Sequence, residues 1–333
     1  MEGGTPMRIY NRSEIKQCVQ LDREVLDAVE DAFSKLQAGR VEMPPIMRVD
    51  IPEHRGEVDV KTAYVHSWDS FAIKVSSGFF HNAKLGLPSG NGMMLLLSAV
   101  TGIPEAVLLD NGYLTDVRTA AAGAVAAKYL APEHVETAGV IGAGTQARYQ
   151  VMALRQVRHF QRLIVYGPTT ERVQQFAREM ETRLGVHIVR AETPEEVVRE
   201  SDVVVTATPA SEPIVKAEWL HPGLHITAMG SDAEHKQELE DEVLQRADVC
   251  VCDVKSQCVE LGELHHVWTH WDEDRRDRVV ELGELTTGKT PGRTGDGQVT
   301  VCDLTGTGVQ DTAIARLALR KLERNVGLGI YVN

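Results

Sequence analysis

Residues 137–147 read TAGVIGAGTQA, and this stretch decides the fold. An apolar run ends in a GxGxxA motif made of Gly142, Ala143, Gly144, Thr145, Gln146 and Ala147, and a helical pattern follows through residue 157. In a strand–turn–helix setting, the first glycine permits the tight turn and the second lets backbone amides approach a pyrophosphate. The alanine allows the helix to pack closely on the strand, and the helix N-terminus adds partial positive charge. The stretch therefore predicts a dinucleotide-binding β-α-β unit.

Strands and helices alternate after this turn. We expect strands within 162–167, 186–191, 202–209, 225–231 and 249–254, and helices within 171–185, 193–201 and 235–248. Strands separated by helices form parallel β-α-β units. The pattern is typical of an α/β class protein with a Rossmann, doubly wound parallel sheet.

The rest of the chain has a different pattern. Strand-like runs at 58–65, 71–80, 92–100 and 105–110 are separated by glycine and proline turns. Amphipathic or alanine-rich helices are expected at 21–39, 114–131 and 309–324, with Thr115 as the N-cap of the second. At 333 residues the chain exceeds what one core usually supports. We therefore expect a second, α+β domain.

Composition excludes several classes of protein. The formal charge of −13 argues against nucleic acid or an anionic membrane as the main partner. No apolar run approaches the ~20 residues that span a bilayer, and the polar N-terminus lacks a signal-peptide pattern, so we expect a cytoplasmic protein. Cys250 and Cys252 alternate with apolar residues, which favours one face of a buried strand over a metal site.

The end of the second strand after the glycine turn normally selects between NAD and NADP, because an acid there binds the ribose 2′-hydroxyl. Residues 165–170 contain no acid. Thr169, Thr170 and Arg172 would suit a 2′-phosphate, but Arg172 would equally suit a solvated helix face. The sequence leaves the cofactor as NAD or NADP.

Three basic residues lie in apolar or turn-rich surroundings, namely Arg48, Lys74 and Arg118. Burying a cation costs several kcal/mol, on the order of 3–5, unless an anion meets it. Either an internal carboxylate such as Asp110 or Asp116 pairs with them, or they bind the carboxylate of a substrate. Both interpretations stand on the residues alone.

Asp232 follows Met229, Gly230 and Ser231 at the carboxyl end of an expected parallel strand, where open α/β sheets bind ligands. A carboxylate there can exchange a proton near a nicotinamide. It would equally suit the N-cap of the helix expected from residue 235.

Four motifs together resemble the ornithine cyclodeaminase/μ-crystallin family. They are LTDVRTAAAGAVAA at 114–127, VIGAGTQA at 140–147, AMGSDAEHKQEL at 228–239 and DLTGTGVQDTAIA at 303–315. The similarity runs over nearly the whole chain. Within the family, the chain looks closest to the ectoine-utilisation and iminosuccinate reductase branch.

The resemblance implies a homodimer and an inserted Rossmann domain. The substrate-binding and dimerisation domain would comprise residues 1–128 and 305–333, and the dinucleotide domain residues 129–304. It also implies hydride transfer between a nicotinamide and the imine of a 2-oxo acid. The family's ligands of the substrate carboxylate match, by motif, Arg48, Lys74 and Arg118. Its catalytic groups match Asp232 and Lys74. The matching cofactor-binding positions are Arg118, Thr119, Gly142, Ala143, Gly144, Thr145, Gln146, Thr169, Arg172, Thr206, Ala207, Thr208, Met229, Gly230, Ser231 and Gly306.

One departure bears on the substrate. True ornithine cyclodeaminases place a glutamate before a Met-Pro pair, whereas this chain has Asp59, Val60, Lys61 and Thr62. Lys61 adds a cation that suits the second carboxylate of a dicarboxylic imine, unless it is a surface lysine on a strand edge. We expect an imine reductase, with iminosuccinate to L-aspartate as the best candidate. The alternatives are an ornithine cyclodeaminase-type lyase and a non-catalytic, crystallin-like dinucleotide-binding protein.

Overall fold

The computed structural model describes residues 7–332 and divides the chain into two compact units. The first comprises Met1–Arg118 and Thr307–Asn333, and the second comprises Thr119–Gly306. The division after Arg118 falls inside helix α3 (Tyr113–Leu130), as does the expected boundary at 128/129. Within residues 7–332, no helix has the length and apolar character needed to cross a membrane.

The second unit is built on an eight-stranded sheet in which every pairing is parallel. In sheet order its strands are β10 (His187–Arg190), β9 (Arg162–Tyr166), β8 (Thr137–Ile141), β11 (Val203–Thr206), β12 (His225–Ala228), β15 (Thr300–Asp303), β13 (Val249–Cys252) and β14 (Val280–Glu281). The direction of winding reverses between β8 and β11. Ligands of doubly wound sheets bind at such a switch point. The predicted fold class is confirmed.

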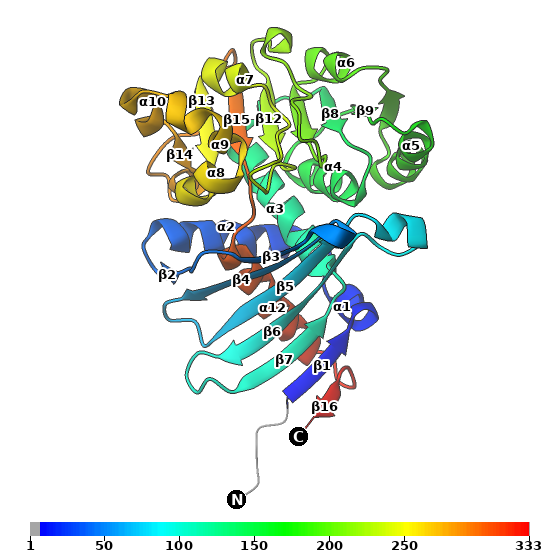
Figure 1. The fold of residues 1–333 in the computed structure, drawn as a ribbon, viewed down its shortest axis with the longest axis vertical. Helices are drawn as coiled ribbons and strands as arrows, with labels where there is room; N and C mark the ends of the chain where they lie inside the picture. The colour runs from blue at the N-terminus through cyan, green and yellow to red at the C-terminus, as the bar shows by residue number, and fades with distance from the viewer. Residues whose placement is uncertain (1–6, 333) are drawn as a thin grey trace, which may run out of the picture. The chain divides into compact units, whose positions relative to one another are not determined.

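Helices cover this sheet (Figure 1). They are α4 (Thr145–Val157), α5 (Thr170–Leu184), α6 (Pro194–Arg199), α7 (Asp241–Arg246), α8 (Lys255–Leu261), α9 (Glu263–Val267), α10 (Glu273–Asp277) and α11 (Leu282–Thr286). Two apolar clusters form the core. One joins β8 to α4 and α5, and the other contains Cys250, Cys252 and Cys258. The interpretation of the strand cysteines as core residues is confirmed.

The helix expected over 235–248 is largely wrong, because only α7 is helical there. Residues 236–240 run extended instead. The carbonyl of Glu238 accepts from the amides of Ile214 and Val215, and the amide of Glu240 donates to Val215. These backbone bonds to a distant segment replace the local helical ones. The interpretation of Asp232 as a helix N-cap is therefore wrong as well.

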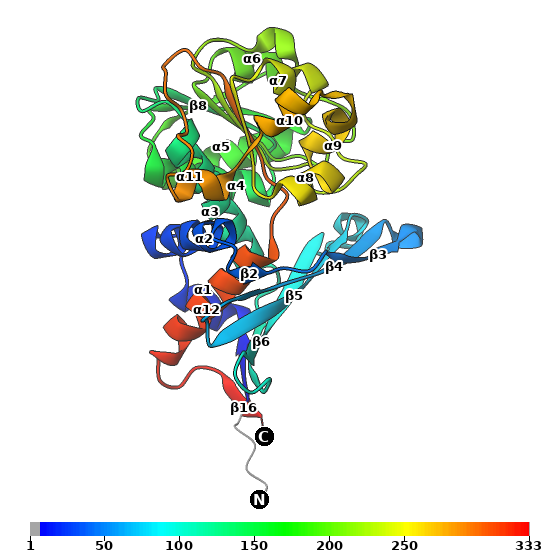
Figure 2. The ribbon, with the colours of Figure 1, turned by 90° about the vertical axis from the view of Figure 1, so that its left-hand side faces the viewer.

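The first unit contains a mixed sheet. Its strands are, in sheet order, β16 (Ile330–Val332), β1 (Met7–Asn11), β7 (Pro104–Leu109), β6 (Gly90–Ser98), β5 (Ser70–Phe79), β4 (Gly56–Val65) and β2 (Val41–Glu42), and β3 (Met47–Ile51) also pairs with β4. Helix α12 (Gly308–Glu323) packs on β4 and β5, and α2 (Arg23–Gln37) packs on α12, so both lie on one side of the sheet (Figure 2). The short α1 (Arg12–Cys18) precedes α2.

The two faces of this sheet differ sharply. The cross-strand row Lys61, Lys74, Met94 and Leu108 is buried on the α12 side. The adjacent row Thr62, Ile73, Leu95 and Val107 points to the other side and stays partly exposed. Because side chains alternate along a strand, the register alone places both lysines on the covered face. The interpretation of Lys61 as a surface lysine is wrong, since only 7 % of the residue is exposed.

Helix α3 begins at Tyr113, three residues before the start at Asp116 that a Thr115 cap would give. Its first turn is held by Asp110, whose Oδ2 accepts from the amide of Leu114 at 2.7 Å. Asn111 and Gly112 between them both adopt positive φ angles, of 53° and 81°. The predicted cap at Thr115 is wrong, because a carboxylate five residues upstream already binds a first-turn amide.

Candidate functional site

The glycine turn of the second unit has the geometry that a dinucleotide requires. Gly142 has a φ of +120°, and a Cβ there would lie 2.6 Å from the carbonyl oxygen of Ala207. Gly144 is the N-cap of α4 and supplies no side-chain cap, and a Cβ on it would meet nothing within 4 Å. The first amides of this 13-residue helix are therefore open to an anion. Arg148 Nη1 holds the carbonyls of Ala143 and Gly144, at 2.6 and 3.0 Å.

The end of β9 carries the residues expected to select the cofactor. Thr169 is the N-cap of α5 and its side chain makes no capping bond. Thr169, Thr170 and Arg172 are all exposed. A Cβ on Gly167 would come within 3.1 Å of Val173, so this strand end is tightly packed as well as free of acids. The arrangement suits either nicotinamide cofactor.

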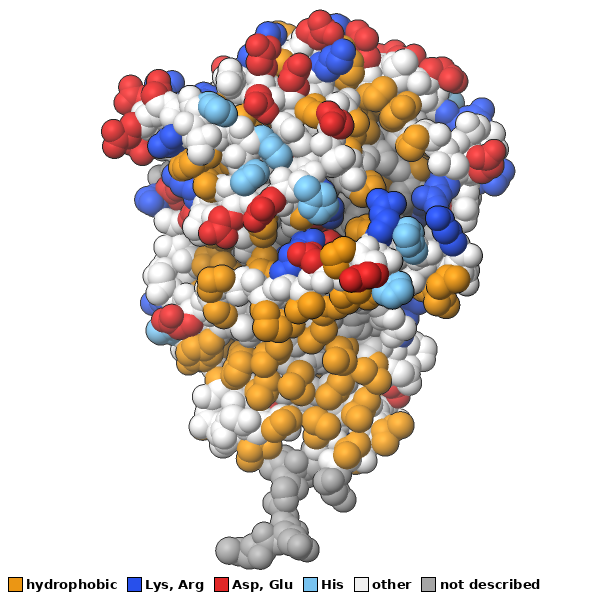
Figure 3. All heavy atoms as spheres, viewed as in Figure 1, with side chains coloured by type: hydrophobic (Ala, Val, Ile, Leu, Met, Phe, Trp, Pro, Cys, Tyr) orange, Lys and Arg blue, Asp and Glu red, His pale blue; other side chains and the backbone are white. Residues whose placement is uncertain are grey.

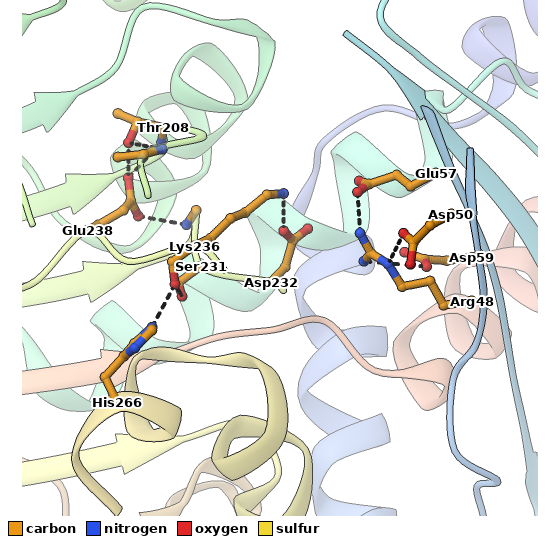
Figure 4. A network of polar contacts seen from close by, with 12 residues as sticks. Arg48, Asp50, Glu57, Asp59, Thr208, Ser231, Asp232, Lys236, Glu238 and His266 are labelled. Carbon is orange, nitrogen blue, oxygen red and sulfur yellow. Dashed lines mark hydrogen bonds and ion pairs between the residues drawn. The ribbon is translucent and has the colours of Figure 1, made fainter. Parts of the chain in front are cut away.

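Glu238 joins the loops that follow β11 and β12 (Figure 4). Its carboxylate accepts from Thr206 Oγ1 at 2.6 Å, from the amide and hydroxyl of Thr208, each at 2.7 Å, and from the amide of Gly230 at 2.8 Å. Burial raises the pKa of Glu238, and these four bonds oppose the rise. The carboxylate thus fixes two segments, 206–208 and 229–231, that were predicted to contact the cofactor.

Asp232 lies beyond these bonds and is 47 % exposed at its side chain. Lys236 Nζ donates to its Oδ1 at 2.5 Å, while the lysine side chain is only 9 % exposed. The Lys236 carbonyl accepts from Ser231 Oγ at 2.7 Å and is 2.8 Å from His266 Nε2. A tight turn therefore presents the Asp232 carboxylate.

The loop after β15 is held by a further buried acid. Asp253 Oδ2 accepts from the amides of Thr305 and Gly306, at 2.9 and 2.7 Å. Gly306, which was expected among the cofactor-binding residues, has a φ of +79°. Across the same sheet edge, Asp303 accepts from the amide of Leu264 at 3.0 Å, and burial raises its pKa to about 7.

A second group of polar residues, in the first unit, is centred on Asp311 of α12. Its carboxylate pairs with Lys74 Nζ at 2.8 Å and with Arg118 Nε at 2.9 Å. Arg118 Nη1 also donates to Gln310 Oε1 at 3.0 Å, and Lys61 is the cross-strand partner of Lys74. All five residues are buried. We call Lys61, Lys74, Arg118, Gln310 and Asp311 the Asp311 cluster.

The charges in this cluster perturb one another. Burial, the largest cause, lowers the pKa of Lys74 to about 7 together with the repulsion of Arg118 and Lys61 and against the attraction of Asp311. Burial alone would raise the pKa of Asp311, but Arg118 and Lys74 hold it below its ordinary value. Burial raises the pKa of the neighbouring Asp110 to about 6. The interpretation that an internal carboxylate pairs with Lys74 and Arg118 is confirmed, but this carboxylate is Asp311 and not the suggested Asp110 or Asp116.

Arg48 on β3 has partners of its own and does not pair with Asp311 (Figure 4). It binds Asp50 at 2.9 Å and Glu57, and lies 3.8 Å from Asp59. Its side chain is 24 % exposed. The structure thus gathers Lys61, Lys74 and Arg118 around one carboxylate and gives Arg48 a separate acidic environment.

Several residues of these sites had no predicted role, among them Lys236, Glu238, Gln310 and Asp311. The signal for Asp311 was present in the sequence, since Gln310 and Asp311 interrupt the apolar pattern of an otherwise buried helix. Lys236 and Glu238 were hidden by the wrong helix.

The family model of the ornithine cyclodeaminase/mu-crystallin family matches residues 7–325. The chain belongs to this family.

Three solved structures of similar proteins cover nearly the whole chain. A Thermococcus litoralis Δ1-pyrroline-2-carboxylate reductase, in complex with NADH and L-proline, is 32 % identical with a TM-score of 0.92, covering 98 % of this chain and 100 % of its own. An archaeal alanine dehydrogenase dimer with bound NAD is 33 % identical with a TM-score of 0.90, covering 99 % of each. The iminosuccinate reductase of Paracoccus denitrificans, in complex with NAD+, is 30 % identical with a TM-score of 0.87, covering 98 % and 99 %.

The lowered pKa of Lys74 makes stability depend on pH. Between about pH 7 and about pH 10 the unfolded chain binds a proton on this lysine that the folded chain lacks, so stability rises with pH there. We expect the difference in free energy of unfolding between wild type and Lys74→Met to shift in favour of the wild type across this range, as measured by urea denaturation. A difference that stays constant would show that Lys74 remains protonated in the fold.

Proposed function

We propose that this member of the family is an NAD(P)H-dependent reductase of imino acids, with iminosuccinate as substrate and L-aspartate as product. The observation that carries the proposal is the charge of the Asp311 cluster. Two buried basic residues, Lys74 and Arg118, share the carboxylate of Asp311, and the buried Lys61 lies beside Lys74 on the same face of the sheet. Asp110 Oδ1 and Gln310 Nε2 are buried without a hydrogen-bond partner among the described residues. An anionic ligand with further polar groups would complement both features.

The residues of the cluster would divide the work of binding a dicarboxylate. Arg118 and Lys74 would hold the carboxylate next to the imine, and Arg48 would contribute from outside the cluster by giving up one of its bonds to Asp50 and Glu57. Lys61, opposite Lys74 on the neighbouring strand, would hold the distal carboxylate. A site that presents two cations discriminates against a substrate with an apolar or cationic tail, because a buried charge would be left unpaired.

The dinucleotide would lie on the α4 turn. Gly142, Ala143, Gly144, Thr145 and Gln146 would receive the pyrophosphate, and Thr169 with Arg172 the adenosine ribose. The segments 206–208 and 229–231, fixed by Glu238, would line the nicotinamide end together with Thr119 and Gly306. The bound nicotinamide supplies the hydride that reduces the imine carbon.

Asp232 would supply the proton that the nitrogen gains, directly or through water, while the substrate carboxylates are held by the cations. Holding both reactants in this way accounts for about 7–11 kcal/mol of barrier lowering in comparable reactions. The residue is half exposed, as a group that exchanges protons with solvent requires.

The similar proteins support this class of reaction. The relatives named above are two imine reductases and an amino-acid dehydrogenase, each with a bound nicotinamide cofactor. The buried Lys61 favours a dicarboxylic imine over the single carboxylate of alanine or proline chemistry. It also disfavours ornithine, whose distal amine would meet a cation.

The assembly would be a homodimer formed through the open face of the first unit's sheet. Figure 3 shows a broad apolar surface over strands β4 to β7, opposite α12. Ile73, Leu95 and Val107 lie in one cross-strand row on it, and Met93 and Leu109 beside them are 43 % and 40 % exposed. An exposed apolar face of this extent is typical of a protein–protein interface. The similar archaeal alanine dehydrogenase is a dimer, which supports the same assembly.

The substrate assignment can be tested with a panel of 2-oxo acids, each with ammonium and with NADH or NADPH. We expect the highest kcat/KM with oxaloacetate, whose imine is iminosuccinate, and no ammonia release from ornithine. Lys61→Met should lower kcat/KM for oxaloacetate about 10- to 100-fold and change that for pyruvate little, because only the dicarboxylate uses the second cation. The exposed Lys84→Met serves as a control. Equal losses for both acids, or ammonia release from ornithine, would overturn the assignment.

The proposed interface can be tested by introducing charged side chains into the apolar face. Ile73→Glu and Leu95→Glu place a carboxylate in the middle of the apolar face, where burial against a partner would be costly. We expect both variants to be monomers in light scattering coupled to size exclusion, and the wild type to be a dimer. Val100→Glu, in the exposed β6–β7 turn, is the matched control. A wild-type monomer, or dimers of both the Ile73→Glu and Leu95→Glu variants, would exclude this interface.

A further inference from the structure

The first unit contains a cavity of about 470 Å³ between the C-terminal half of α12, the start of β5 and the strands β7, β1 and β16. A volume of this size is typical of sites for small molecules, but such sites are mostly lined by apolar side chains. This one is lined mainly by charges of both signs, so it needs another explanation than packing. The charged residues are Arg8, Asp69, Glu105, Arg316, Arg320 and Glu323.

Helix α12 forms one side of the cavity. Arg316, Leu319, Arg320 and Glu323 follow the i, i+3, i+4, i+7 spacing that places side chains on one face of a helix. At a rise of ~1.5 Å per residue, Arg320 lies roughly 13 Å along the helix from Asp311. The cavity is therefore separate from the Asp311 cluster, although both lie on the covered side of the sheet.

Glu105 lines the cavity because β7 contains a bulge. Leu96 pairs with Ala106 and Leu97 pairs with Pro104, so Glu105 is an extra residue on β7. Strict alternation would place Glu105 on the open face, because Ala106 is buried on the covered one. A bulge changes the direction of a side chain. Here it brings an acid to the side of the sheet on which α12 packs.

Two of the three arginines are held in place by the protein. Arg316 Nη1 donates to Asp69 Oδ1 at 2.6 Å. Arg8 Nη1 donates to Tyr10 Oη at 3.2 Å, and its Nη2 donates to Tyr331 Oη. The phenol oxygens are neutral acceptors, and a guanidinium has five donors. Arg8 is therefore an oriented cation whose charge these bonds do not neutralise.

The other three charged groups of the cavity have no partner. Among residues 7–332, the side chains of Glu105, Arg320 and Glu323 make no hydrogen bond or ion pair. Burial raises the pKa of Glu105, and the carboxylates of Asp69 and Glu323 add to the rise. Burial lowers the pKa of Arg320, and the charge of Arg316 adds to that effect. A counter-charge supplied from outside the chain would stabilise both charged forms.

We propose that this cavity binds a free α-amino acid in its zwitterionic form. Glu105 and Glu323 bind the ammonium group, and Arg320 and Arg8 bind the carboxylate. Leu319 contacts the side chain of the ligand. A simple anion such as phosphate would meet the unpaired acids, and a simple amine would meet the unpaired arginines, so the cavity disfavours both.

This site does not depend on the proposed reduction of an imine. It uses none of the residues assigned above to the substrate or the cofactor. It also lies on the side of the sheet opposite the proposed dimer interface, so that interface leaves it accessible.

The test is isothermal titration calorimetry of the full chain with each standard L-amino acid. We expect at least one of them to bind with a Kd below about 1 mM. The amine without its carboxylate, and the acid without its amine, should each bind at least about 10-fold more weakly, because each leaves one pair of charges unmatched. Binding of no amino acid, or equal binding of either analogue, overturns the proposal.

Variants assign the binding to the cavity. Glu105→Gln and Arg320→Gln should each raise the Kd of the best amino acid about 10- to 100-fold, because each removes a charged hydrogen-bonding partner. Arg324→Gln, exposed at the end of the same helix and outside the cavity, is the matched control for Arg320→Gln. Lys61→Met, in the proposed substrate site, should leave this Kd unchanged. A Kd that neither Glu105→Gln nor Arg320→Gln changes places the ligand elsewhere and overturns the proposal.

A further variant covers the case in which Glu105→Gln does not fold, as judged by circular dichroism. Glu323→Gln then decides, because Glu323 is exposed and its replacement costs the fold little. An unchanged Kd in that variant overturns the proposal. The reduction assays described above report separately on the proposed function, so a chain that reduces no imine but binds an amino acid with these dependences would refute only the proposed function.

Discussion

The ion pairs of Asp311 are the interactions on which the first unit depends. One carboxylate near the start of the last long helix pairs with a strand lysine and a helix arginine that are remote from it in sequence. If one of these charges were buried without its partner, the fold would lose several kcal/mol of stability, on the order of 3–5. The close seating of α12 makes the pairing possible, since a Cβ on Gly308 would lie 2.3 Å from the carbonyl of Thr62.

This arrangement places the proposed substrate-binding residues and the proposed dimer interface on opposite faces of one sheet. Because side chains alternate along a strand, Lys61 and Lys74 lie on the face that α12 covers, and Ile73 and Leu95 lie on the open face. A shift of register by one residue would exchange these rows and destroy both properties. In the second unit, Glu238 has the corresponding organising role, since it joins the ends of β11 and β12, next to the switch point between β8 and β11.

The features that depend on the local pattern of residues could be predicted from the sequence. The GxGxxA turn, the alternating strands and helices after it, and the positions of Lys74, Arg118 and Asp232 follow from period and motif. The partner of the two cations could not be read in this way, because Asp311 reaches them only through the tertiary packing of α12 on β5. The extended segment 236–240 resembles a helix in composition, and its tertiary bonds to 210–215 override that propensity. The cap at Asp110 was missed because it requires two successive residues with positive φ.

The central claim is that a hydride from the nicotinamide reduces an imine of a dicarboxylate. The most direct measurement uses NADH with deuterium in both positions at C4 of the nicotinamide, together with oxaloacetate and ammonium, followed by NMR and mass spectrometry of the product. The account predicts L-aspartate with one deuterium on Cα. Deuterated malate, or aspartate without deuterium, would contradict it.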